Sequence, residues 1–126
     1  MRPSFDCVRR STLLTIQTHA GLELALGAAL IVLPFALGLS AGALVVGFAL
    51  GGLIAGLALA GSEPASRGGL PLLAHSAYDL AVATALLCAG VALGLTDGPR
   101  PLILFLAAGL AELTLMLSTS YSERRA

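Results

Sequence analysis

Four long apolar runs, each of about 20 residues, decide what this sequence can fold into. A helical run of this length matches the thickness of the hydrocarbon core of a bilayer. The runs show no alternation of apolar and polar residues, so they do not fit the strands of a barrel, and only helices would satisfy their backbone groups in lipid. We therefore expect an all-α integral membrane protein, built as a four-helix bundle.

The short connections between the runs show which runs are paired. We expect spans at about residues 20–39, 41–61, 70–95 and 102–118. Only GLSAG separates the first two and TDGPRP the last two, so each pair forms a tight antiparallel hairpin. One membrane domain would cover residues 1–126, with a first hairpin at about 19–61, a cytoplasmic loop at 62–69 and a second hairpin at about 70–120.

The amino-acid composition excludes several classes of function. The chain has 126 residues, of which 57% are apolar and 11% charged, so the spans leave little sequence for a soluble catalytic domain. The formal net charge is zero and all seven bases are arginine, without a basic tract that could neutralise many phosphates. We expect the lipid bilayer as a partner, together with a second copy or a larger membrane complex, and no nucleic acid.

The arginines predict the orientation in the membrane. Six of the seven fall before the first span, in the central loop or after the fourth span: Arg2, Arg9, Arg10, Arg67, Arg124 and Arg125. Arg100 alone lies in a turn on the other side. The positive-inside rule therefore places both termini and the central loop in the cytoplasm.

The two hairpins look like copies of one unit. With an offset of 56, residues 19–40 and 75–96 are identical at nine of 22 positions. The two histidines of the chain, His19 and His75, align, and each is followed four residues later by an acid. Because both copies start on the same side, an axis along the membrane normal would relate them.

The stretch LELALGAALIVLPFALGLS, followed by a span rich in small residues, resembles the SPW repeat, a bacterial two-helix membrane unit. Leu33, Pro34 and Phe35 stand where that family carries Ser-Pro-Trp, so the proline matches, while the second copy has Ala89, Gly90 and Val91 there. The resemblance implies a small multi-span protein of the bacterial inner membrane and no catalytic activity.

Five ionisable residues inside the spans are the best functional candidates. His19 and Glu23 share one helix face, as do His75 and Asp79, and Glu112 stands in the fourth span with no acid in the second span to match it. A charged acid at the bilayer centre costs about 2.5–3.5 kcal/mol, so these groups should face the bundle interior, be paired or be protonated. We place Glu112 nearer the middle of the membrane than the other two acids.

Three interpretations of this set remain open. The residues could be polar contacts between helices in a non-enzymatic packing or accessory protein, which we favour. Acids and histidines at staggered depths could instead relay protons or ions. Two histidines at matching depth could also ligate a haem b, with the neighbouring acids orienting the imidazoles.

No other pattern of catalytic or metal-binding residues is present. A ferritin-like di-metal site needs Glu-x-x-His on two helices and an acid from each of two others, whereas this chain has His-x-x-x-acid. Phosphate loops, nucleophile elbows and H-E-x-x-H motifs are missing as well. We therefore expect no enzyme activity, no metal centre and, the haem alternative apart, no cofactor.

Small residues predict where helices approach closely. The second span carries two G-x-x-x-G pairs, Gly47 with Gly51 and Gly52 with Gly56. These glycines could pack inside the bundle or against another protein.

Overall fold

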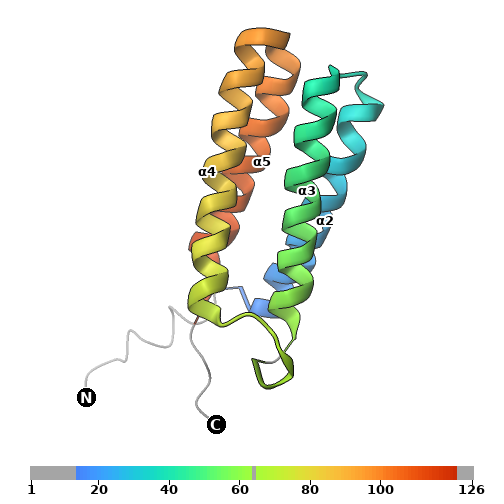
Figure 1. Cartoon of the computed structure of the whole chain (residues 1–126). Helices are drawn as coiled ribbons and strands as arrows, with labels where there is room; N and C mark the ends of the chain where they lie inside the picture. Colours follow the sequence, from blue (N-terminus) through green and yellow to red (C-terminus); the bar gives the residue numbers. More distant parts are fainter. Residues whose placement is uncertain (1–13, 64, 122–126) are drawn as a thin grey trace, which may run out of the picture.

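The computed structural model describes residues 14–63 and 65–121. Within these residues the chain forms an antiparallel four-helix bundle without strands (Figure 1). The elements are α2 (Ile16–Ala36), α3 (Ala41–Ser62), the short 3-10 helix η1 (Ala65–Arg67), α4 (Leu72–Asp97) and α5 (Pro99–Ser118). All four α-helices are long and apolar enough to cross a membrane. The expected all-α architecture is confirmed, and the chain has the character of a multi-pass membrane protein.

Local sequence explains where the helices begin. The Thr15 side chain accepts from the backbone N–H of Thr18 and caps α2, so this helix starts four residues earlier than the apolar run suggested. Ser40 caps α3 in the same way through the N–H of Ala43. Pro99 is the first residue of α5, where its missing N–H costs no helical hydrogen bond.

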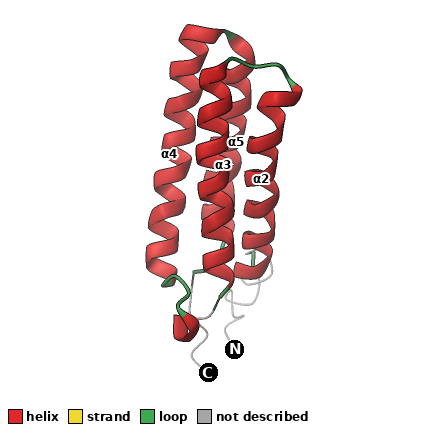
Figure 2. Cartoon of the chain, turned by 45° about the vertical axis from the view of Figure 1, so that its right-hand side comes forward, coloured by secondary structure: helices red, strands yellow, loops and turns green. Residues whose placement is uncertain are grey.

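The helices pack most closely within each hairpin, α2 with α3 and α4 with α5 (Figure 1). Figure 2 shows the four helices and the loops that join them from a second side. Pro34 has no N–H, so the Leu30 carbonyl loses its helical donor. That carbonyl lies against Gly47, where an added Cβ would stand 2.6 Å from its oxygen. The freed carbonyl therefore faces a glycine of the neighbouring helix.

The two glycine pairs of α3 behave differently. Gly47 and Gly51 are buried against α2, and a Cβ on Gly51 would lie 2.6 Å from the backbone oxygen of Gly27. Gly52 and Gly56 are exposed, with nothing within 4 Å of an added Cβ. Of the two alternatives left open by the sequence, packing inside the bundle describes the first pair, whereas Gly52 and Gly56 lie on the outward face of α3.

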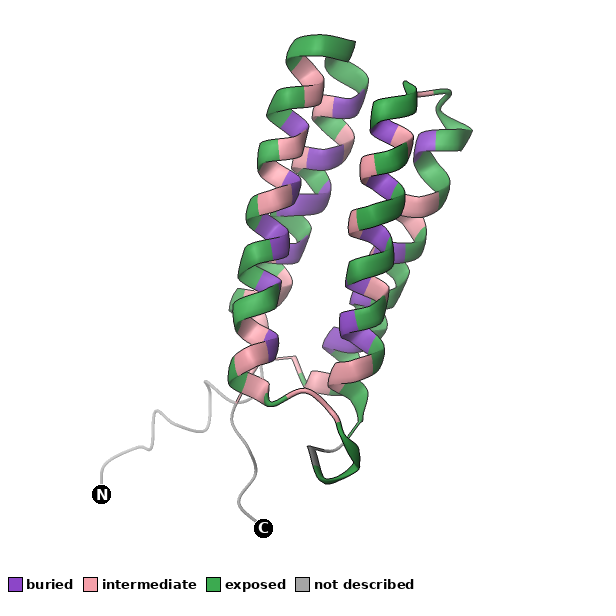
Figure 3. Cartoon of the chain, in the orientation of Figure 1, coloured by how far each residue is buried: buried purple, intermediate pink, exposed green. Residues whose placement is uncertain are grey.

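The hairpins meet along an apolar core (Figure 3). Its largest fully buried apolar side chains are Phe105, Leu30, Ile54 and Leu86, which come from all four helices. At the turn end of the bundle, the Ser40 hydroxyl donates to the Asp97 carboxylate and links the two hairpins.

The other end of the bundle gathers the start of α2, the central loop and the end of α5. Leu14 N–H donates to the Ser118 carbonyl at 2.8 Å, and Ser120 N–H donates to the Leu14 carbonyl at 3.2 Å. We call this end the terminal end. The flanking arginines at positions 2, 9, 10, 124 and 125 lie outside the described residues.

Adjacent glycines provide a matched test of the α2–α3 contact. We expect Gly51→Ala to lower the free energy of unfolding by about 1–3 kcal/mol, because its Cβ would meet the fixed backbone of Gly27. Gly52→Ala, one residue along, should change it little. Thermal unfolding in detergent, followed by circular dichroism, measures both, and equal effects would contradict the packing described here.

Candidate functional site

The two histidine–acid pairs predicted from the repeat meet in one buried cluster. His19 and Glu23 come from α2, and His75 and Asp79 from α4. All four side chains have an exposed fraction of 0%. One potential metal-ligating atom from each lies within 4.8 Å of the corresponding atoms of the other three. We call these four residues the His–carboxylate cluster.

Each carboxylate lies between both imidazoles. His19 Nε2 is 3.2 Å from Glu23 Oε1 and 3.3 Å from Asp79 Oδ2. His75 Nε2 is 3.4 Å from Glu23 Oε2 and 3.4 Å from Asp79 Oδ1. Two of these four contacts each lie within one helix, and the other two join one hairpin to the other.

Glu112 of α5 belongs to the same neighbourhood. It is 1% exposed, and the charges of Glu23 and Asp79 act on it. It lies six residues from the end of α5, and Glu23 seven residues from the start of α2, so both stand about 10 Å inside the terminal end. The expectation that Glu112 lies nearer mid-membrane than Glu23 is wrong, because α2 begins at Ile16, four residues earlier than expected, and Glu23 therefore lies as far inside the bundle as Glu112.

Thr119 and Tyr121, which follow α5 in the chain, contact the cluster from the terminal end. His19 Nδ1 lies 2.7 Å from Thr119 Oγ1, and the Thr119 hydroxyl itself donates to the Leu115 carbonyl at 2.6 Å. The Tyr121 hydroxyl donates to Asp79 Oδ2, and its ring contacts the rings of both histidines. Burial, followed by the bond to Asp79, raises the pKa of Tyr121 above its ordinary value, so the phenol stays a donor.

Gly61 of α3 makes room for the second histidine. A Cβ at this position would stand 2.6 Å from His75 Nδ1. A larger residue would push the imidazole away from the carboxylates. Sequence reasoning did not identify Gly61, Thr119 or Tyr121, because these residues carry no motif and their roles depend on how α3 and the segment after α5 meet α2 and α4.

The cluster does not fit a bis-histidine haem. Axial imidazoles must lie on opposite faces of a porphyrin, with the ring between them. Here the imidazole centroids are 5.6 Å apart, and the carboxylates of Glu23 and Asp79 contact both rings. A porphyrin would have to displace both carboxylates.

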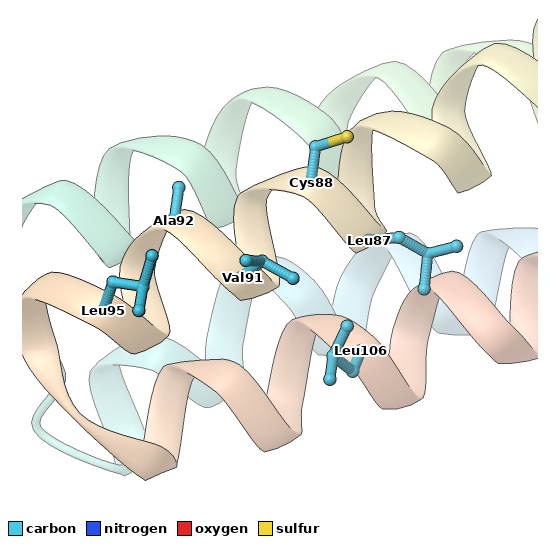
Figure 4. A pocket seen from close by; sticks show the side chains of 6 residues that line it. All are labelled: Leu87, Cys88, Val91, Ala92, Leu95 and Leu106. Carbon is cyan, nitrogen blue, oxygen red and sulfur yellow. The ribbon is translucent and has the colours of Figure 1, made fainter.

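A shallow apolar groove runs along the outer face of α4 and α5 (Figure 4). It is lined by Leu87, Cys88, Val91, Ala92, Leu95 and Leu106. These side chains offer no charged group that could orient a polar ligand. The ionisable side chains of interest lie instead in the His–carboxylate cluster. In comparisons with known families, characterised proteins and solved structures, nothing matched this chain.

The contact between His19 and Thr119 can be tested against a matched threonine. Thr119→Val should lower the free energy of unfolding by about 1–3 kcal/mol, because it leaves a buried His19 nitrogen without a partner. Thr114→Val removes a similar hydroxyl-to-carbonyl bond on the exposed face of α5 and should have a much smaller effect. Chemical denaturation in detergent measures both, and equal losses would show that Thr119 does not support His19.

Proposed function

We propose that this chain is a small, non-enzymatic membrane protein that acts by packing and assembly, with the His–carboxylate cluster tying its two hairpins together. The observation that carries the proposal is where the polar groups lie. In the described part of the chain, the buried polar and charged side chains all lie at the terminal end: His19, Glu23, His75, Asp79, Glu112 and Thr119.

The rest of the interior argues against a conducting path. From the cluster toward the turns, the bundle is filled by apolar side chains such as Leu30, Leu86 and Phe105, which are 0–1% exposed. A proton or ion relay needs polar groups or water at successive depths. Conduction through Glu23, Asp79 and Glu112 is therefore the less favoured function.

The proposed location is the bacterial inner membrane, with both termini in the cytoplasm. The arginine distribution supports this orientation, and the terminal end would then face the cytoplasm. The resemblance of the first hairpin to the SPW repeat stays a prediction. Assembly with a second copy or a larger complex belongs to the proposal, and the exposed Gly52 and Gly56 give α3 a smooth outer face for it.

Vesicle flux separates the two functions. We expect the reconstituted protein to pass no more protons or monovalent cations than empty vesicles do, because none of the buried polar side chains among the described residues lies between Glu112 and the turns. Glu112→Gln keeps the shape of the side chain and removes its titration. The variant should therefore be as stable as the native protein and should likewise show no flux. Flux in the native protein that disappears in Glu112→Gln would overturn the packing function and support a relay.

Cysteine labelling tests the orientation. With Cys7 and Cys88 replaced by serine, we expect an impermeant thiol reagent to modify Pro99→Cys in intact cells. Ser66→Cys in the central loop should react only after permeabilisation. Both positions are exposed, so the opposite pattern would reverse the topology and equal labelling would contradict the number of spans.

A further inference from the structure

The atoms at the centre of the His–carboxylate cluster lack hydrogen bonds. Both histidine Nε2 atoms, both oxygens of Glu23 and Oδ1 of Asp79 are buried without a hydrogen-bond partner. Their nitrogen–oxygen distances are nevertheless 3.2–3.4 Å. The side chains thus point at a common centre without the angles that hydrogen bonds between them would need.

The contacts of Thr119 identify which nitrogen of His19 carries a proton. A carbonyl cannot donate, so the Thr119 hydroxyl must give its hydrogen to Leu115. Thr119 can then only accept from His19, and Nδ1 is the N–H nitrogen. In the neutral imidazole, Nε2 therefore presents its lone pair to the carboxylates of Glu23 and Asp79.

A lone pair facing two buried carboxylates leaves their negative charge uncompensated, and a cation between them would compensate it. Two carboxylates and two neutral imidazoles carry a charge of −2, which a divalent ion balances. Burying that charge without compensation would be costly. Protons on the two Nε2 atoms would also balance it, but each would be shared between two oxygens at nearly equal distances, with neither oxygen in line.

The spacing also fits a metal site. In a tetrahedral zinc site with bonds of about 2.0–2.2 Å, neighbouring ligand atoms are about 3.3–3.6 Å apart. In the cluster, each Nε2 lies 3.2–3.4 Å from one oxygen of each carboxylate, and the two histidines approach different oxygens. With one ligand atom taken from each side chain, the four atoms lie within 4.8 Å of one another, so a bound ion would draw them slightly closer together. A hydrogen bond from the second nitrogen of a ligating histidine, here from His19 to Thr119, is the usual support of such a ligand.

We propose that the His–carboxylate cluster binds one divalent first-row transition-metal ion, with Zn²⁺ as the best match, through His19, Glu23, His75 and Asp79. Imidazole favours zinc and its neighbours over Mg²⁺ and Ca²⁺, and the cluster has no thiolate that would select Cu⁺. The ion would join α2 to α4 and so lock the two hairpins. Gly61 and Tyr121 help to position this site, since one leaves space for His75 and the other donates to Asp79.

The test uses the full chain, purified in mild detergent, stripped with a chelator and titrated with Zn²⁺. We expect one zinc per chain by elemental analysis, a rise in Tm with zinc, and little response to Mg²⁺. Asp79→Asn should abolish tight zinc binding. Asp97→Asn, an exposed acid on the same helix at the turn end, should bind like the native protein. Thr119→Val should weaken zinc binding by about 10–100-fold, as expected for the partner of a ligating histidine.

Co²⁺ provides a readout that needs no variant, because its visible absorption strengthens when octahedral water is replaced by tetrahedral protein ligands. Failure of the native chain to hold zinc or to change the Co²⁺ spectrum would overturn the proposal, as would native affinity in Asp79→Asn. If Asp79→Asn does not fold, Glu23→Gln replaces it with the same expectation. The inference goes beyond the proposed packing function, and the two can fail separately. If the chain binds no zinc, the contacts of the cluster between the hairpins still support the packing function. If the chain conducts protons, the packing function is rejected, but the metal proposal is not affected.

Discussion

The burial of two histidines and two acids at one end of an apolar bundle is the constraint on which the rest of this structure depends. Each side chain is 0% exposed in a chain that crosses a medium of low polarity. Such groups are stable only when their charges cancel locally. Cancellation here requires both hairpins, because Glu23 and Asp79 each contact both histidines. The charges therefore hold α2 and α4 together at a place where apolar packing alone would not fix their register.

The internal repeat explains how such a site arises from a simple unit. A single hairpin carries one histidine and one acid four residues apart, which is half of the cluster. Bringing two copies together places the four ligand atoms around one centre, with α2 and α4 beginning at equivalent positions of the repeat. The copies differ where the site is supported from outside: Thr119 and Tyr121 follow only the second hairpin, and Gly61 belongs only to the first.

The sequence predicted the fold and the ionisable residues of the site, but not how these residues converge or what supports them, and the reasons can be identified. Apolar length predicts helices that cross a bilayer, and the spacing of His19 and Glu23 predicts a shared helix face. Convergence of the two pairs depends on how the hairpins rotate against each other, which spacing within one helix cannot reveal. The depth of Glu112 relative to Glu23 was misjudged because it depends on where α2 begins, which the Thr15 cap moves to Ile16. Gly51 and Gly52 are adjacent in an equally apolar stretch, so only packing distinguishes the buried one from the exposed one.

The position of the cluster also determines from which side it can exchange with solvent. The apolar core around Leu86 and Phe105 separates it from the turns, while Tyr121, half-buried, lies against both imidazoles from the terminal end. A proton or ion that reaches the histidines would therefore come from the terminal end, where Thr119, Tyr121 and Gly61 lie against them. It follows that the orientation of the chain decides which compartment supplies the cluster. In the proposed orientation, with the termini in the cytoplasm, that compartment is the cytoplasm.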